Sequence, residues 1–212
     1  MSRLLRYQDV LEVIERLVEV GRTRGDEVRE PLVLVGGSAM AARGIRAESV
    51  DVDLFAPNVS PDVAHEAERA LAARFGAAFR LDVTGVANLW GPIMIRDIGD
   101  APVVPDRPGG LILRALSVED LFLLKLQAGR DKDRDDLALL AAQTSSEALI
   151  GRFGQLAAWH GNRAELMRFA DDVVRELAAR YGADPRRVIA EVAVPEYVRA
   201  ALRDAWAGAD DD

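Results

Sequence analysis

Two aspartates, Asp51 and Asp53, alternate with apolar residues in the segment SVDVDLFAP, residues 49–57. Such alternation indicates a β-strand, in which residues two apart share one face and have Cα atoms about 6 to 7 Å apart. The two carboxylates would converge above the sheet, where they repel one another unless a cation lies between them. Mg²⁺ takes oxygen ligands of this kind and keeps room for water and substrate phosphates. The pattern therefore predicts a divalent-metal site on this strand.

A third carboxylate, Asp82, belongs to a second alternating segment, AFRLDVTG at residues 78–85. If the two strands are neighbours, three carboxylates gather, enough to hold two metals about 3.5 to 4 Å apart for in-line attack on a phosphoryl group. The turn at Gly36, Gly37 and Ser38 supplies the complementary part. Glycines allow close backbone approach, and the amides that open the next helix point at an anion. We therefore predict a phosphate cradle beside the metal site.

The joint pattern, Gly37-Ser38 followed after twelve residues by Asp51-Val52-Asp53, resembles the signature of the polymerase-β-like nucleotidyltransferase superfamily. In that superfamily a Gly-Ser pair precedes a D-x-D or D-x-E strand, and a later strand supplies a third carboxylate, which Asp82 matches. The segment LSVEDLFLLKLQAGRDKDRDDLALL, residues 116–140, resembles the second half of a prokaryotic branch that includes the AbiEii-type toxins. The motifs cover roughly residues 30–140, and the C-terminal third carries none of them.

The resemblance implies transfer of a nucleoside monophosphate from an NTP, ATP among the candidates, to an acceptor with the help of Mg²⁺, two ions being expected. It implies that Asp51 and Asp53 bind both metals, and that Asp82 holds the catalytic metal and helps to deprotonate the acceptor hydroxyl. The matched nucleotide-binding positions are Gly36, Gly37 and Ser38 around the triphosphate, Lys125 as a point charge on the phosphates, and Arg46 and Arg130. The branch often has Arg-x-Thr-x-Asp-x-Asp; here Ser49 stands at the Thr position and Arg46 lies one residue early.

The surrounding segments predict the elements that position these residues. Helical spacing of apolar residues predicts a helix over residues 3–22, and short apolar or alternating runs predict strands, the later ones within residues 90–105 and 109–116. A helix capped by Ser38, a helix from Ser60 to Gly76, two helices after residue 117 and three within residues 146–206 complete the pattern. We expect an α+β nucleotidyltransferase fold, a small twisted mixed sheet flanked by helices, in residues 1–145, followed by a helical region in residues 146–212.

Composition narrows the functional classes. A formal net charge of −8 disfavours general nucleic-acid binding, because phosphate contacts need clustered basic residues, although a local basic groove remains open. The absence of cysteine excludes disulfides, thiolate metal sites and a cysteine nucleophile, and it fits the reducing cytoplasm that we expect. No run of about 18 apolar residues occurs, so no membrane span is expected. P-loop and dinucleotide-binding glycine motifs are absent as well.

Three functional hypotheses follow. The leading one is a Mg²⁺-dependent nucleotidyltransferase acting on tRNA or a protein hydroxyl, as the toxin of a toxin–antitoxin pair with a cognate partner. The second is a non-catalytic or antitoxin-like regulatory protein with the same fold, and the third is a small-molecule nucleotidyltransferase of the aminoglycoside type. Simpler interpretations stay open at the residue level: Asp51 and Asp53 as the polar half of an edge strand, and Lys125 as an ordinary helix lysine.

Overall fold

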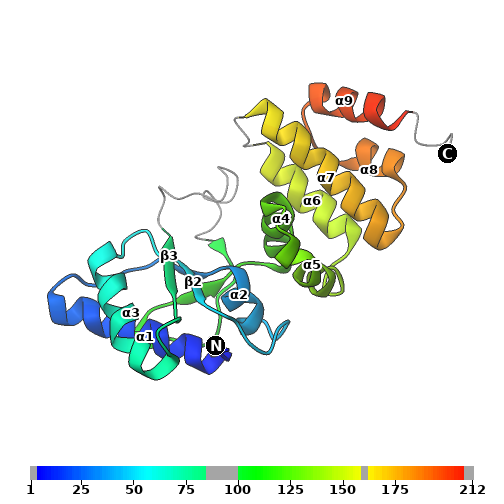
Figure 1. Ribbon diagram of the computed structural model, residues 1–212. Coiled ribbons are helices and arrows are strands. Elements are labelled where there is room, and N and C mark those ends of the chain that lie inside the picture. Colours follow the sequence, from blue (N-terminus) through cyan, green and yellow to red (C-terminus); the bar gives the residue numbers. More distant parts are fainter. Residues whose placement is uncertain (1–3, 85–99, 159–161, 208–212) are drawn as a thin grey trace. The chain divides into compact units, whose positions relative to one another are not determined.

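The computed structural model describes residues 4–84, 100–158 and 162–207, which fall into two compact units. Unit 1 holds the described residues up to Ser117, and unit 2 holds those from Val118 onward (Figure 1). The expected α+β class with a small mixed sheet flanked by helices is confirmed. The compact units divide after Ser117, where the sequence changes from mixed to helical segments, and the expected boundary near residue 145 stays a prediction.

Unit 1 is built on a four-stranded sheet of order β3-β2-β1-β4. Its strands are β1 (Leu32–Leu34), β2 (Val52–Phe55), β3 (Leu81–Thr84) and β4 (Leu113–Ala115). Strand β1 runs antiparallel to β2 and parallel to β4, and β2 runs parallel to β3. The carboxyl end of β1 therefore lies beside the amino end of β2, and the amino ends of β2 and β3 lie at the same edge of the sheet.

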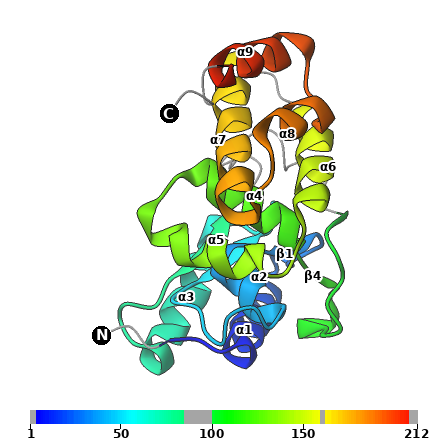
Figure 2. The ribbon, with the colours of Figure 1, turned by 90° about the vertical axis from the view of Figure 1, so that its right-hand side faces the viewer.

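Helices α1 (Tyr7–Arg24) and α3 (Pro61–Phe75) lie side by side against the sheet of unit 1 (Figures 1 and 2). The start of α3 follows from its sequence, because the Ser60 hydroxyl accepts the Val63 N–H and a proline occupies the first helical position. The apolar faces of both helices are buried. The core of unit 1 thus lies between these helices and the apolar residues of the strands, which include Val52, Leu54 and Leu81.

The remaining elements of unit 1 connect the strands. Helix α2 (Gly36–Ala42) follows β1 directly, and the 3₁₀ turn η2 (Pro108–Gly110) precedes β4. The predicted cap at Ser38 is wrong: the N-cap is Val35, three residues earlier, and the helix begins at Gly36. The strand expected within residues 90–105 lies mostly outside the described residues, although Val103 makes an isolated antiparallel bridge with Arg114.

Unit 2 is helical throughout its described residues. It comprises α4 (Val118–Ala128), the 3₁₀ turn η3 (Asp131–Asp133), α5 (Arg134–Ala141), α6 (Ser146–Ala157), α7 (Arg163–Tyr181), α8 (Pro185–Glu191) and α9 (Glu196–Trp206). Its core includes Phe153 and Phe169, whose rings meet edge to face with centroids 5.1 Å apart. None of the helices described in either unit is long and apolar enough to span a bilayer.

Residues 146–206 contain four helices where the sequence predicts three. The predicted break at 182–185 is confirmed, since Gly182 takes a left-handed conformation and the Asp184 side chain caps α8. The additional break lies between α8 and α9. There Val192 is extended, with φ −67° and ψ 131°, and Pro195 cannot donate the backbone hydrogen bond that would continue the helix.

Candidate functional site

The register of β2 and β3 brings two of the predicted carboxylates together. Asp53 and Asp82 are direct partners in these neighbouring parallel strands. Partners in a parallel pair lie on the same face of the sheet about 4.8 Å apart in the hydrogen-bonding direction. Asp53 is half-buried and Asp82 is exposed, and the Asp82 carboxylate accepts a long hydrogen bond, 3.4 Å, from the Thr84 hydroxyl. A third carboxylate could join the first two only if the two strands were neighbours, and they are.

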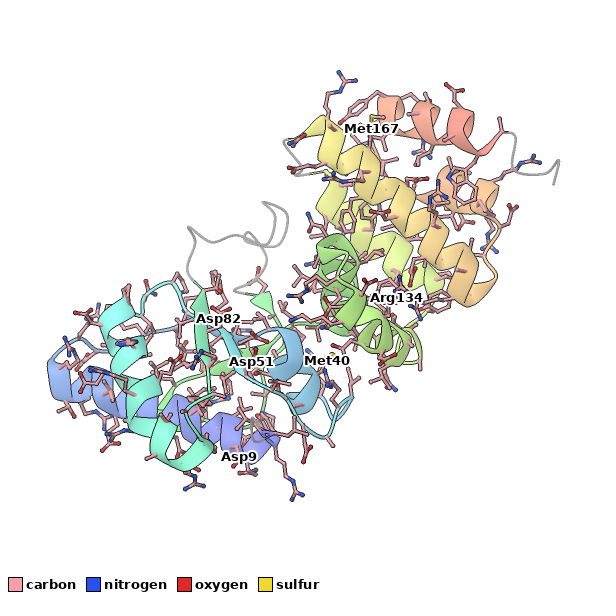
Figure 3. The ribbon with its side chains drawn as sticks, in the orientation of Figure 1. Asp9, Met40, Asp51, Asp82, Arg134 and Met167 are labelled. Atoms are coloured by element: carbon pink, nitrogen blue, oxygen red, sulfur yellow. The ribbon has the colours of Figure 1, made fainter. Side chains whose placement is uncertain are left out.

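Asp51 lies one residue before β2 rather than within it. Figure 3 shows Asp51 and Asp82 near one another, at the edge of unit 1 where β2 and β3 begin. Asp51 is half-buried, and within the described part of the chain its carboxylate has no hydrogen-bond or ion-pair partner. A half-exposed carboxylate of this kind is accessible to water and to a cation.

Gly36 and Gly37 form the first turn of α2 and press against Asp53 and Ser49. Gly36 has φ +50°, and a Cβ atom there would lie 2.3 Å from Oδ2 of Asp53. A Cβ atom on Gly37 would lie 2.5 Å from the Ser49 hydroxyl. The Gly37 N–H donates to the Asp53 carboxylate over 3.3 Å. The glycines are therefore needed for close approach, and the groups they approach in this structure are the Asp53 carboxylate and the Ser49 hydroxyl of the chain itself.

Ser38 is fully buried, and its hydroxyl is engaged with the strand beside it. The oxygen accepts the Asp53 N–H over 3.1 Å and donates to the Asp51 carbonyl over 3.2 Å. Ser49, buried as well, donates to the same carbonyl over 2.9 Å. The predicted phosphate contact of Ser38 would consequently use its backbone amide, which lies in the first turn of α2.

Arg46 lies in the connection between α2 and β2, within unit 1. It is half-buried, and its backbone N–H donates to the Met40 carbonyl over 3.4 Å. Unit 1 therefore brings together the glycines, Ser38 and the three aspartates, and it carries Arg46 on the loop between them.

Lys125 and Arg130 belong to unit 2, where they bind carboxylates. The Lys125 ammonium lies 2.8 Å from Asp133 Oδ1 and 2.7 Å from Asp136 Oδ2, and all three side chains are buried. Arg130 lies 2.6 Å from the second oxygen of Asp133. Burial raises the pKa of Asp133, but the hydrogen bonds from Arg130 and Lys125 outweigh it, and the pKa falls below its ordinary value.

Asp133 is the member of this network that sequence reasoning did not single out. The sequence feature that could have pointed to it is the lysine within the apolar run LFLLKLQ of α4. A lysine in such a run is expected to be buried, and a buried ammonium needs carboxylate partners. Two carboxylates, of Asp133 and Asp136, lie within 2.8 Å of the Lys125 ammonium. These two ion pairs explain how a lysine can be buried here.

The donor atoms at the β2–β3 edge suit a hard cation. As they stand, the described residues include no group of three His, Cys, Asp or Glu side chains placed to hold one metal ion. In this arrangement Asp53 Oδ2 accepts the Gly37 N–H over 3.3 Å. Mg²⁺ is usually bound through one or two carboxylates, with water and substrate phosphates completing its octahedron. Asp53 and Asp82 can supply such a pair, with Asp51 two residues away along the chain.

No protein-family model matches the chain, and no curated protein or solved structure is similar to it.

Proposed function

We propose that unit 1 is the catalytic centre of a Mg²⁺-dependent nucleotidyltransferase, with Asp51, Asp53 and Asp82 as its acidic residues. The observation that supports this most strongly is the register pairing of Asp53 with Asp82 on one face of the sheet. The Asp51 carboxylate, which has no partner among the described residues, and the glycine turn of α2 at the same edge add to it. An ordinary polar edge strand would explain one of these features but not their combination.

In this proposal each part of the site has a defined task. Asp51 and Asp53 would hold Mg²⁺, which neutralises phosphate charge and stabilises the attacking and leaving oxygens of an in-line displacement. Asp82, exposed on β3, would join them as a Mg²⁺ ligand and would also accept the proton of the acceptor hydroxyl. The hydroxyl oxygen forms a bond to the α-phosphorus of the NTP, the bond between the α-phosphorus and the bridging oxygen breaks, and pyrophosphate leaves. The amides that open α2 would face the phosphates.

The acceptor class follows from the resemblance and not from the geometry: tRNA or a protein hydroxyl, with the protein acting as the toxin of a toxin–antitoxin pair in the cytoplasm. An exposed Asp82 is compatible with an acceptor larger than a small molecule, because such a group must reach the site from outside. A non-catalytic regulatory protein with this fold is the second candidate. The engagement of Lys125 and Arg130 with carboxylates favours it, because it removes two of the expected phosphate contacts.

The test is transfer of label. The purified protein is incubated with Mg²⁺, each of the four α-labelled NTPs, and total RNA or soluble protein as acceptor. Label is expected on one acceptor class, and Asp51→Asn is expected to abolish it. Asp204→Asn on α9 is a matched control, since it makes the same change at an exposed aspartate of unit 2. Equal labelling by Asp51→Asn would refute the catalytic role, and absence of labelling by the unaltered protein would favour the regulatory candidate.

A further inference from the structure

The hydrogen-bond ladder between β1 and β2 stops at Val35. Its N–H still donates to the Asp53 carbonyl over 3.1 Å, but its own carbonyl accepts the Ala39 N–H of α2 over 3.0 Å. The Asp53 N–H would meet that carbonyl if the ladder continued. It bonds instead to the Ser38 hydroxyl, over 3.1 Å. A side chain of α2 thus replaces the missing strand residue beside Asp53.

The Asp51 carbonyl is held by two buried hydroxyls at once. Ser38 donates to it over 3.2 Å and Ser49 over 2.9 Å. A carbonyl oxygen has two lone pairs, so both are used. Ser49 is itself fixed by two backbone bonds of 2.7 Å to Leu5, one in each direction. The peptide between the two aspartates is therefore anchored by α2 and by the N-terminal segment of the chain.

We infer that Ser38 and Ser49 are positioning residues that fix the backbone at Asp51 and Asp53, and thereby aim the two carboxylates at Mg²⁺. This inference rests on the proposed function, because it assigns these hydroxyls to the same metal site. It differs from the role that the resemblance implies for Ser38, contact with the triphosphate. A serine hydroxyl has one proton to donate, and that of Ser38 is given to the Asp51 carbonyl.

Isothermal titration calorimetry of Mg²⁺ binding in the absence of nucleotide distinguishes the positioning role from contact with the triphosphate. Ser38→Ala and Ser49→Ala are each expected to weaken Mg²⁺ binding about three- to ten-fold, the effect of one lost hydrogen bond. The double variant should be weakened by less than the product of the single effects, because both hydroxyls act on one carbonyl. Ser49→Thr keeps the hydroxyl and should bind as the unaltered protein does.

Ser60→Ala is the matched control. It removes a serine hydroxyl that caps α3 in the same unit, so it should lower thermal stability and leave Mg²⁺ binding unchanged. If Ser38→Ala does not fold, Ser49→Ala carries the test alone.

The outcomes separate this inference from the proposed function. Unchanged Mg²⁺ binding in both serine variants, together with loss of binding in Asp51→Asn, would overturn the positioning role and leave the metal site standing. Weaker NTP binding in Ser38→Ala with unchanged Mg²⁺ binding would show a phosphate ligand and would also overturn it. If the unaltered protein does not bind Mg²⁺, the inference and the proposed function both fall.

Discussion

At the scale of the residue, the site depends on the absence of a side chain at position 36. Gly36 combines a left-handed φ of +50° with a Cα position that faces Oδ2 of Asp53. Both features exclude other residues, the first by local strain and the second by collision. Gly44 shares the first feature, with φ +68°, but a Cβ atom there would meet nothing within 4 Å. Comparing substitutions at the two positions therefore distinguishes the cost of backbone strain from a collision with the Asp53 carboxylate.

Gly36→Ala is expected to impair Mg²⁺ binding, because the new methyl group must displace the Asp53 carboxylate. Gly44→Ala should cost a similar strain, about 1 kcal/mol of unfolding free energy, and leave Mg²⁺ binding intact. Urea denaturation measures the strain, and calorimetric titration measures the binding. Normal Mg²⁺ affinity in Gly36→Ala would mean that the Asp53 carboxylate is not a ligand in its observed place.

The residue types of the site could be read from the sequence, but their bonds could not. Asp51, Asp53 and Asp82 stand out because aspartate is uncommon in strands. The partners of Ser38 depend on the residue at which β1 ends and α2 begins. The N-cap lies three residues before the expected one, so the Ser38 side chain bonds to the backbone of β2 instead of capping the helix. Local pattern does not determine such a boundary, because packing against β2 decides it.

At the scale of the element, Lys125 joins α4 to the turn η3 and to α5. Its ammonium is buried between Asp133 on η3 and Asp136 on α5. Removing one partner from a buried ion network leaves uncompensated charge, which is the strongly destabilising case. The lysine that the resemblance assigned to phosphate thus has a structural task in unit 2.

Lys125→Met should lower the unfolding free energy by about 3 to 5 kcal/mol, because two buried carboxylates lose their shared cation. Lys132→Met is the matched control: Lys132 is exposed on η3, and its loss should change stability by less than about 0.5 kcal/mol. Chemical denaturation monitored by circular dichroism gives both values. Equal stability of the two variants would show that Lys125 is not needed to hold these elements together.

The lowered pKa of Asp133 predicts an acid dependence of stability. Because its folded pKa lies below the unfolded value of about 3.9, the carboxylate contributes its full stabilisation above roughly pH 4. That contribution is lost as the pH falls through the folded pKa. The stability difference between the unaltered protein and Asp133→Asn should therefore shrink between pH 5 and pH 2, as urea denaturation at several pH values can show. A constant difference would contradict the ionic role.

Elements with strong local signals were predicted well, and those set by packing were not. The Ser60 cap, the first-turn proline and Gly76 bound α3 where the sequence placed it. The break before Pro195 was missed, although proline is its cause, because a proline at the start of a helix is as common as one after its end. The partners of Lys125 follow it by eight and eleven residues and lie on other elements. Helical spacing predicts contacts only between residues three or four apart, so it could not predict these pairs.

At the scale of the whole molecule, each compact unit has a core of its own. Unit 1 buries strand residues beneath α1 and α3, and unit 2 buries the faces of its helices around residues such as Phe153 and Leu177. The sequence shows the change from mixed to helical segments after residue 117, where the compact units divide. Helices α4 and α5, which belong to unit 2, carry part of the nucleotidyltransferase-like motifs. The motifs therefore extend over both compact units.

Hydrogen exchange can follow the two units separately. Mg²⁺ with an NTP analogue should slow amide exchange at β1, the start of α2 and the start of β2, because ligand binding stabilises these segments of unit 1. Lys125→Met should accelerate exchange in α4 and α5 without ligand. Mass spectrometry of peptic fragments resolves these regions. Ligand protection that excludes β1 and β2 would place the nucleotide site elsewhere.

The central claim is that Asp82 joins Asp51 and Asp53 in one Mg²⁺–nucleotide site, and calorimetric titration of Mg²⁺ with a non-hydrolysable NTP analogue tests it most directly. We predict Mg²⁺-dependent binding of the analogue, at least about tenfold weaker in Asp82→Asn and unchanged in the exposed control Asp204→Asn. Binding of equal strength in Asp82→Asn and the unaltered protein would contradict the account.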